Sequence, residues 1–287
     1  ECLTRPVLGL ARKGLAMTSK LGADFFTTVP PPRTLAPYVR RILIAHNDAP
    51  IDLTVTPAPT GFNVIGWIYS GGAECWIDGA RETVEIGGLH YAGQIQLKRT
   101  AVRYFGKYGH VIAETTATGF YELTHLTGRS VRDAAGNFDL ARHGWARDFA
   151  TRASGLPDTA SAEERCALFV ERLEALVPGA RSAPPFVSAA AAMIEDAPGH
   201  VSMTGVTQAL GVGRRHLTRT FTDIVGLSPK AFQLVLSVNR AIALWAQGDV
   251  PTLTQLAQEA GFHDQAHFNR TFKRYFHAPP RDLFGDP

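Results

Sequence analysis

Cysteine is scarce in this sequence, with only three among 287 residues, at Cys2, Cys75 and Cys166. Three widely spaced cysteines lack the CxxC spacing of a structural zinc site and are too few for a disulfide framework. The sequence therefore argues against a disulfide-stapled secreted protein and favours a reduced, cytoplasmic compartment. We expect each cysteine to behave as a small buried hydrophobe rather than as a redox sensor.

Long apolar runs and a strong excess of charge are missing as well. The longest apolar stretch, at 186–194, is far shorter than the roughly 18 residues that span a membrane. Arg12 and Lys13 interrupt the apolar piece near the start, which makes it a poor signal peptide, and Met17 is one candidate for the natural start. The net charge of +3 permits an anionic partner without requiring one. We expect no membrane partner.

What is present is enough material for two packed domains. Hydrophobic residues make up 45% of the chain and charged residues 19%, so a core is easily built. Short segments rich in β-branched and aromatic residues occur in the first half, at 62–69, 73–77, 82–86 and 102–108. Turn signals separate them, namely Ser70-Gly71-Gly72, Asp78-Gly79 and Gly87-Gly88. This pattern predicts a β-rich domain at 21–180, a sandwich or small barrel with trailing helices, after a tail at 1–20.

Helical patterns dominate the second half. The segment 161–176 is predicted as a helix, because Ser161 and Glu164 form a capping box ahead of an apolar stripe. Prolines 184 and 185 mark a linker at 181–186, and residues 187–287 are predicted to form an all-α domain. The expected fold class is therefore α+β.

The last hundred residues contain an internal repeat. The stretch TGVTQALGV at 204–212 aligns with TQLAQEAGF at 254–262, fifty residues later. After a one-residue insertion, Leu217, Phe221 and Pro229 align with Phe268, Phe272 and Pro280. Each copy indicates a helix, a tight turn at Gly211 or Gly261, and a second helix, which is the helix-turn-helix unit.

A spacer helix is predicted between the two copies. Ser228 is a good N-cap, Pro229 suits the first helical position, and Gly248 ends the pattern. A helix of about 17 residues is roughly 25 Å long. Such a spacer would hold two recognition helices near the repeat of about 34 Å that separates successive major grooves of DNA.

The second helix of each copy has a polar outer face. Arginine reads guanine and glutamine reads adenine through paired hydrogen bonds, whereas contacts to phosphates supply affinity and salt dependence. The candidate base contacts are Arg215, Thr218, Arg219, Gln265, Ala266 and Arg270. The candidate phosphate contacts are Arg214, Asn269, Lys273 and Arg274. Residues 186–287 hold nine Lys/Arg and eight Asp/Glu, a net of +1, so binding must depend on where the arginines are placed.

The segments LGVGRRHLTRTFTDIVGLSP and GFHDQAHFNRTFKRYFHAPP resemble the DNA-binding domain of AraC/XylS-type transcriptional regulators. The residues that meet the family pattern are Gly261, Phe262, Phe268, Arg270, Phe272, Lys273 and Pro280. The sequence departs from it at His277, Leu283, Gly213 and Thr207, where the family usually has Gly, Tyr or Phe, Ser and Ala. The resemblance implies a regulator that binds double-stranded DNA. RNA polymerase, a small-molecule effector and a second copy of the chain are further candidate partners.

The β-rich half loosely resembles the sensor domains of such regulators, which bind an effector, mediate dimerisation, or both. Aromatic and polar residues of the predicted strands are the candidates for an effector pocket: Trp67, Tyr69, Trp76, His90, Tyr91, Arg103 and Tyr104. For the two tryptophans, a place in the ordinary core is the alternative.

Two further classes stay open, a cupin-like metalloenzyme in the first half and an architectural DNA-binding protein. A metal oxygenase needs a His-x-His pair and a nearby carboxylate. His90 has no histidine two residues away, and the spacing of His110 and Glu114 is unremarkable on a strand. We therefore expect no metal, no cofactor and no catalytic site, and a front half of sensor size argues against a purely architectural role.

Overall fold

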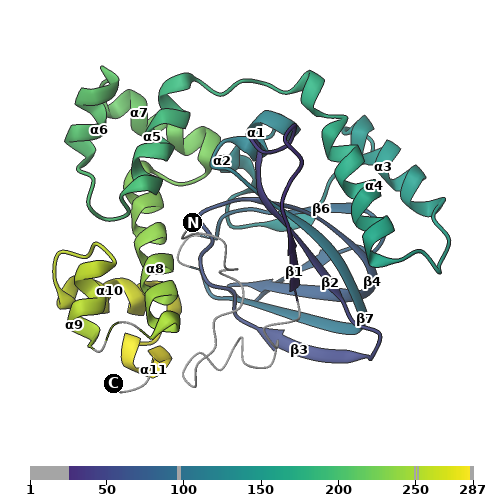
Figure 1. Cartoon of the computed structure of the whole chain (residues 1–287), viewed down its shortest axis with the longest axis horizontal. Helices are drawn as coiled ribbons and strands as arrows, with labels where there is room; N and C mark the ends of the chain where they lie inside the picture. Colours follow the sequence, from purple (N-terminus) through teal and green to yellow (C-terminus); the bar gives the residue numbers. More distant parts are fainter. Residues whose placement is uncertain (1–25, 96–97, 249, 251, 285–287) are drawn as a thin grey trace.

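The computed structural model of the chain describes residues 26–95, 98–248, 250 and 252–284. Figure 1 shows a β domain whose sheet carries helices, with a second, helical domain beside it. The predicted α+β class is therefore confirmed. The predicted tail at 1–20 and Cys2 lie outside the described residues.

The β domain is built on one antiparallel sheet of eight strands. Its strands are β1 Phe26–Val29, β2 Val39–His46, β3 Ile51–Val55, β4 Val64–Ile77, β5 Ala80–Val84, β6 Leu89–Ala92, β7 Thr100–Thr115 and β8 Ala135–Asn137. They pair in the order β1-β2-β7-β4-β6-β8, while β3 pairs with β7 and β5 pairs with β4. The two long strands β4 and β7 therefore form the centre, and the shorter strands pair with different halves of them.

One predicted turn is wrong. Ser70-Gly71-Gly72 does not reverse the chain but lies within β4, where the pairing with β7 shifts register on both sides of Ser70. A Cβ on Gly71 would lie 2.5 Å from the carbonyl oxygen of Phe105, so glycine is needed for the close approach of β7. The turn at Asp78-Gly79 is confirmed, because both residues have positive φ and join β4 to β5 as a tight hairpin.

Four helices follow β7 along the chain, and β8 lies between the second and the third of them. They are α1 Gly119–Thr124, α2 Gly128–Val131, α3 Gly144–Ser154 and α4 Ala162–Glu174. The capping box predicted for α4 is present, with Ser161 accepting from the Glu164 amide and Glu164 accepting from the Ser161 amide. Phe120, Phe149 and Phe169 from these helices pack with Trp67 in one hydrophobic cluster. This cluster covers one face of the sheet.

The helical domain contains two helix pairs and a spacer. Its helices are α5 Pro185–Asp196, α6 Met203–Leu210, α7 Arg214–Val225, α8 Pro229–Gln247, α9 Leu253–Glu259, α10 Gln265–Phe276 and α11 Pro280–Phe284. The spacer α8 begins after Ser228, whose side chain accepts from the Ala231 amide, and ends at Gly248 in the left-handed conformation, as predicted. At 19 residues, α8 is about 28 Å long.

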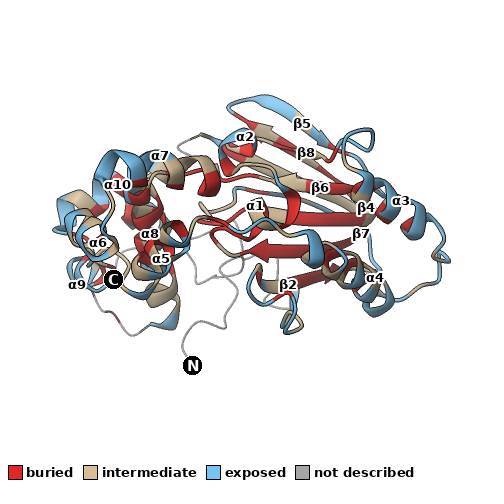
Figure 2. Cartoon of the chain, turned by 90° about the horizontal axis from the view of Figure 1, so that it is seen from above, coloured by how far each residue is buried: buried red, intermediate tan, exposed pale blue. Residues whose placement is uncertain are grey.

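Two apolar cores hold the helical domain together. Val206, Leu217 and Phe221 lie in the first, and Leu256, Phe268 and Phe272 lie in the second. The first core also contains residues of the β domain, since Ala117 is one of its buried members and Tyr121 packs against it. Buried residues continue from the sheet into α8 in Figure 2. The two domains are therefore joined by shared packing as well as by the chain.

The described cysteines are buried, as predicted. Cys75 is 8% exposed and Cys166 is 6% exposed, and both are free thiols. Burial raises the pKa of Cys75 to about 11, which keeps it as an unreactive thiol. No helix in the described part of the chain has the length and apolar character needed to cross a membrane.

Candidate nucleic-acid interface and adjoining cavity

The second helix of each pair, α7 and α10, presents one face to its own core and the other to solvent. In α7 the buried positions include Leu217 and Phe221, and in α10 they include Phe268 and Phe272. All ten residues predicted to contact DNA are exposed: Arg214, Arg215, Thr218, Arg219, Gln265, Ala266, Asn269, Arg270, Lys273 and Arg274. In Figure 2 the outer sides of α7 and α10 are coloured as exposed. The amphipathic pattern thus places every candidate contact on the solvent-exposed side of its helix.

The two helices begin differently. Asp264 caps α10, because its carboxylate accepts a hydrogen bond of 2.6 Å from the backbone amide of His267. That bond, together with the adjacent His263 side chain, holds the pKa of Asp264 below its usual range. Gly213 stands at the equivalent position of α7 and has no side chain with which to cap it. The departure noted in the sequence is therefore visible as a missing cap.

Neighbouring helices position parts of the second helix pair. The hydroxyl of Thr254 on α9 donates to Oε1 of Gln265 at 2.9 Å, which restrains the orientation of this candidate base contact. Arg240 of the spacer donates from Nε to the carbonyl of Glu259 at the end of α9, at 2.8 Å. A cation at a helix C-terminus is favourable because the last carbonyls lack partners within the helix. Arg240 thereby links the spacer to the second unit.

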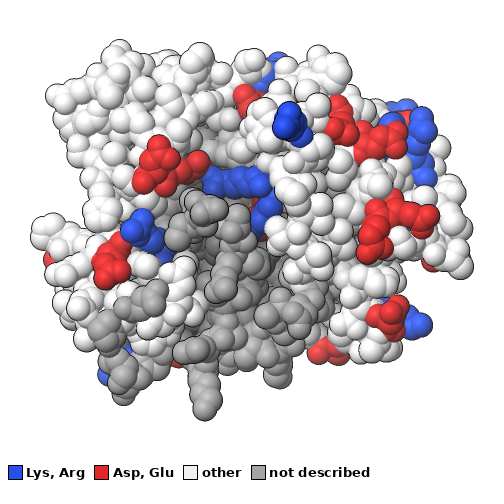
Figure 3. Space-filling model, viewed as in Figure 1, with Lys and Arg blue, Asp and Glu red and all other residues white. Residues whose placement is uncertain are grey.

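Charge on the surface is mixed rather than uniformly basic. On the face shown in Figure 3, basic and acidic side chains lie next to one another. The outer face of α7 is richer in basic side chains. A shallow groove there is lined by Arg214, Arg215, Thr218, Arg219 and Thr222, together with Arg129 of α2. Four arginines are thus concentrated at this groove although the surface as a whole is mixed in charge.

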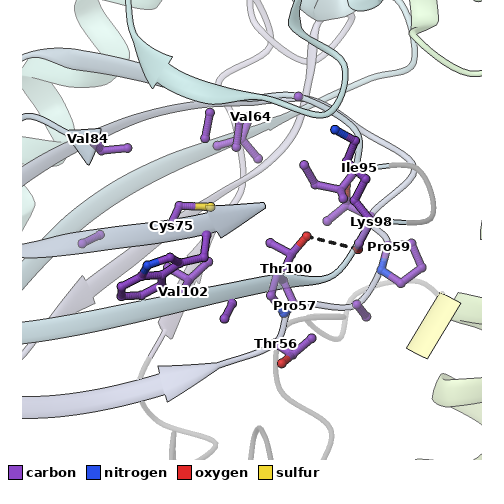
Figure 4. Close-up of a pocket in the computed structure, with 18 of the residues that line it drawn as sticks. Thr56, Pro57, Pro59, Val64, Cys75, Val84, Ile95, Lys98, Thr100 and Val102 are labelled. Carbon is purple, nitrogen blue, oxygen red and sulfur yellow. Dashed lines mark hydrogen bonds between the residues drawn. The ribbon is translucent and has the colours of Figure 1, made fainter. Parts of the chain in front are cut away.

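A cavity of about 490 Å³ lies on the other face of the sheet. Its wall is largely apolar, as Figure 4 shows for Val102, Cys75 and Pro57. Tyr275, Phe276 and His277, at the end of α10 and just after it, complete the lining from the helical domain. The cavity has the size and character of a small-molecule site. It therefore meets both the sheet and the second recognition helix.

The structure brings four of the seven predicted pocket residues to this cavity, Trp76, His90, Tyr91 and Tyr104. The other three lie elsewhere. Trp67 packs edge-on against Phe149 among the helices, with ring centres 5.1 Å apart. Tyr69 stacks beneath the guanidinium of Arg165 on the same side. Arg103 is outside the lining, where it forms an ion pair of 2.7 Å with Asp52.

The alternation of side chains along a strand explains much of this division. Trp67 and Tyr69 share one face of β4, while Ile68 lines the cavity from the opposite face. The alternation was readable in the sequence, but the face that the helices cover was not. The strand sequences do not show which face of the sheet α3 and α4 pack against.

A buried pair of histidines, His90 and His110, in the lining of the cavity was not predicted from the sequence. Nε2 of His110 lies 3.2 Å from Nε2 of His90, and the Tyr108 hydroxyl lies 2.7 Å from Nδ1 of His110. The rings fit over Gly66, where a Cβ would lie 2.6 Å from the His90 ring. Burial lowers the pKa of His90 to about 4 and that of His110 well below its usual value, with His90 adding to the second shift. Both rings are therefore neutral.

In the described part of the chain, His90 and His110 are not grouped with a third side chain that could ligate a metal. Within residues 26–95, 98–248, 250 and 252–284, there is no group of three or more His, Cys, Asp or Glu side chains arranged to hold a metal ion. Glu114, the carboxylate considered in the sequence analysis, forms an ion pair with Arg41. The pairing of β6 and β7 with β4 brings His90 and His110 together although they are twenty residues apart.

Comparisons with known proteins address the helical domain most directly. Residues 206–285 match the model of a helix-turn-helix domain family. Over 73 residues the chain is 34% identical to the HTH-type transcriptional regulator GbdR of Pseudomonas aeruginosa, a match that covers 25% of this chain and 20% of GbdR. Over 72 residues it is 33% identical to the HTH-type transcriptional regulator MtrA of Neisseria gonorrhoeae, covering 25% of this chain and 24% of MtrA. The chain thus aligns with about a fifth to a quarter of the length of these relatives.

A solved structure shows a similarity that extends further along the chain. The crystal structure of ToxT from Vibrio cholerae has a TM-score of 0.45 and 12% sequence identity, and the alignment covers 85% of this chain and 98% of ToxT. The residues matched by the family model contain both recognition helices and the spacer between them. Residues 206–285 therefore form a helix-turn-helix domain similar to those of the HTH-type transcriptional regulators named above.

Proposed function

We propose that the chain is a transcriptional regulator that binds promoter DNA sequence-specifically and is not an enzyme. The observation that carries the proposal is the duplicated helix pair with all ten candidate contact residues exposed on α7 and α10. The spacer α8, about 28 Å long, suits two helices that enter successive major grooves, whose repeat is about 34 Å. One chain would then supply what a dimeric helix-turn-helix protein supplies with two.

Within this proposal the candidate contacts divide into two roles. Gln265 and Arg270 lie in the first and second turns of α10, where side chains reach base edges. Lys273 and Arg274 lie in the last turn and suit phosphates. On α7, Arg215, Thr218 and Arg219 take the base-reading role and Arg214 the phosphate role.

A small molecule bound in the β-domain cavity is proposed to control DNA binding. The cavity is lined largely by apolar residues of the β domain and by Tyr275, Phe276 and His277, so an occupant would contact the C-terminal end of α10. Such contact gives a ligand a direct way to favour one position of the second recognition helix, provided that it binds the two positions with different affinity. Dimerisation through the β domain is the alternative mode of control.

Selection of DNA by the full chain tests the proposed function. Genomic fragments are incubated with the protein, with and without a metabolite library, and the retained fragments are sequenced. We expect one enriched motif with two parts about one helical turn apart, and a metabolite that changes its enrichment. Retention of fragments without a shared motif would overturn sequence-specific recognition.

A matched pair of variants tests the assignment of roles on α10. Arg270→Ala should weaken binding to the selected site by about 1–3 kcal/mol and relax the preference at one base pair. Arg274→Ala should weaken selected and unrelated sites alike, because a phosphate contact carries no sequence information. A uniform loss with Arg270→Ala would assign that residue to the phosphates instead.

A further inference from the structure

The short helix α2 of the β domain lies against the C-terminal end of the first recognition helix, as both Figure 1 and Figure 2 show. The contact is between backbones. A Cβ on Gly128 would lie 2.4 Å from the carbonyl carbon of Val225, and a Cβ on Gly226 would lie 2.9 Å from the carbonyl oxygen of Gly128. Gly226 also has φ of +95°, a conformation that L side chains rarely adopt. Two facing glycines therefore let α2 and α7 approach more closely than side chains would allow.

Hydrogen bonds from the β domain reinforce this contact. Nε2 of Gln94 donates to the carbonyl of Val225 at 2.7 Å, and the Gln94 side chain is only 2% exposed. Nη1 of Arg132 donates to the carbonyl of Gly226 at 3.5 Å. The last carbonyls of a helix have no partners within it, so these donors serve as a cap supplied by the other domain. The position of α2 relative to α7 is therefore specified at several points.

This placement carries Arg129 of α2 to the outer face of α7. Nε of Arg129 lies 2.8 Å from a carboxylate oxygen of Asp223, and both side chains are about half exposed. Arg129 lines the same shallow groove as Arg215 and Arg219, two candidate base contacts. An arginine has five N–H donors in a planar fork, so a guanidinium held through Nε has its two Nη groups for a second acceptor. The groove brings together arginines from two domains.

We propose that Arg129 contacts the phosphate backbone of DNA beside the major groove entered by α7, so that the β domain is itself part of the DNA interface. The inference rests on the proposed function. A phosphate is the expected partner because Arg129 reaches the groove near Asp223, in the C-terminal half of α7, whereas base edges are read from the N-terminal part of a recognition helix. The contact supplies affinity and salt dependence and carries no sequence information.

The salt dependence of DNA binding by the full chain tests this inference. The dissociation constant for a selected duplex is measured from about 50 to about 200 mM KCl for the unaltered chain and for Arg129→Gln. Each phosphate contact contributes about 0.9 to the slope of log affinity against log salt. Arg129→Gln should therefore lower the slope by about 0.9, and its disadvantage relative to the unaltered chain should shrink about 3.5-fold across this fourfold range of salt. Arg129→Lys should retain the slope.

Two control variants separate a DNA contact from a structural ion pair. Arg142→Gln removes an exposed arginine that pairs with Asp139 on the β domain and does not line the groove, so it should leave the slope unchanged. Asp223→Asn removes the partner of Arg129 but keeps the guanidinium, so affinity should hold or rise. The thermal unfolding midpoint of each variant is measured to confirm that it is folded.

Distinct outcomes overturn the two proposals. If the unaltered chain selects a motif and Arg129→Gln binds it with an unchanged slope, or more tightly, Arg129 does not contact phosphate. If Asp223→Asn reproduces the loss seen with Arg129→Gln, the ion pair acts through structure and not through DNA. If the unaltered chain selects no DNA, the proposed function fails and this inference falls with it.

Discussion

The two helix-turn-helix units share one plan but are restrained at opposite ends. The first recognition helix, α7, starts at Gly213 without a side-chain cap, and its last carbonyls accept hydrogen bonds from the β domain. The second, α10, starts at the capping carboxylate of Asp264 and ends at His277, which has φ of +57° and lines the cavity. The end of α7 is thus capped by donors of the β domain, whereas the start of α10 is capped by a residue next to it in the sequence.

Because of this difference, the two units relate differently to the cavity in the β domain. A molecule in the cavity would meet the second unit directly, through Tyr275, Phe276 and His277. It would reach the first unit less directly, through Tyr275, which also packs against the first core. Substitutions at equivalent core positions should destabilise the two units to a similar extent. Substitutions at the helix ends should affect the two units differently.

The largest expected effect comes from substitutions in the apolar cores of the two units. Phe221 and Phe272 occupy equivalent positions of the repeat, and both are 0% exposed. Replacing either with alanine should lower the free energy of unfolding by about 3–5 kcal/mol, because a large buried ring leaves a cavity. Urea-induced unfolding followed by intrinsic fluorescence measures the loss. Ile86→Ala, at a side chain that is 56% exposed, is the control and should change little. A large loss at only one of the two phenylalanines would show that the cores are not equivalent.

A smaller effect is expected at the contact that distinguishes the first unit. Gly128→Ala should lower the free energy of unfolding by about 1–3 kcal/mol, because the added methyl group must displace the backbone at Val225. The same urea measurement applies. The matched control is Gly144→Ala, where a Cβ would meet nothing within 4 Å. If the two alanine variants had the same urea midpoint of unfolding, the backbone at Val225 would have moved to fit the methyl group without loss of stability.

The smallest effect is expected at the helix starts, where the two units can be made more alike. Gly213→Ser supplies α7 with a capping hydroxyl and should raise the free energy of unfolding by a few tenths of a kcal/mol. Asp264→Ala removes the cap of α10 and should act in the opposite direction. The thermal unfolding midpoint of each variant provides the measurement.

The effect at Asp264 should also depend on pH. Its pKa is lowered in the folded chain, so the stabilisation by the carboxylate is present above the usual pKa of 3.8 and is lost as pH falls through the lowered value. The difference between Asp264→Ala and the unaltered chain should therefore be full at neutral pH and shrink in strong acid, where the protonated carboxyl keeps only a neutral capping oxygen. Asp264→Asn, which retains a capping oxygen, should show a smaller difference at neutral pH. A difference that did not vary with pH would rule out a role for the charge.

Local chemistry was predictable from the sequence. Ser161 and Ser228 act as the expected caps, and Asp78-Gly79 forms the expected hairpin. The repeat spacing placed the buried phenylalanines correctly, and the outward residues followed from helical periodicity. Each of these features depends on residues a few positions apart, or on a comparison of the chain with itself.

Features that depend on distant parts of the chain were not predictable. Gly71 resembled a turn residue, but its need for glycine arises from the approach of Phe105 on another strand. His90 and His110 meet only through the pairing of three strands. Gln94 and Val225 are separated by 131 positions, and neither residue type indicates the other. The sequence patterns of helices and strands contain no information about such pairs.

The paired glycines at 128 and 226 have a consequence for rearranging the protein. The sequence indicates a boundary at 181–186, where a linker joins the two halves, and a chimaera would naturally be cut there. A foreign front half would then have to provide its own glycine and its own amide donor at the end of α7, in the same geometry as Gly128 and Gln94. Recombination between chains of this architecture should therefore succeed mainly when the exchanged piece carries compatible segments around residue 94 and residues 116–132. The piece of this chain that can be exchanged intact is therefore larger than the domain that ends at the linker.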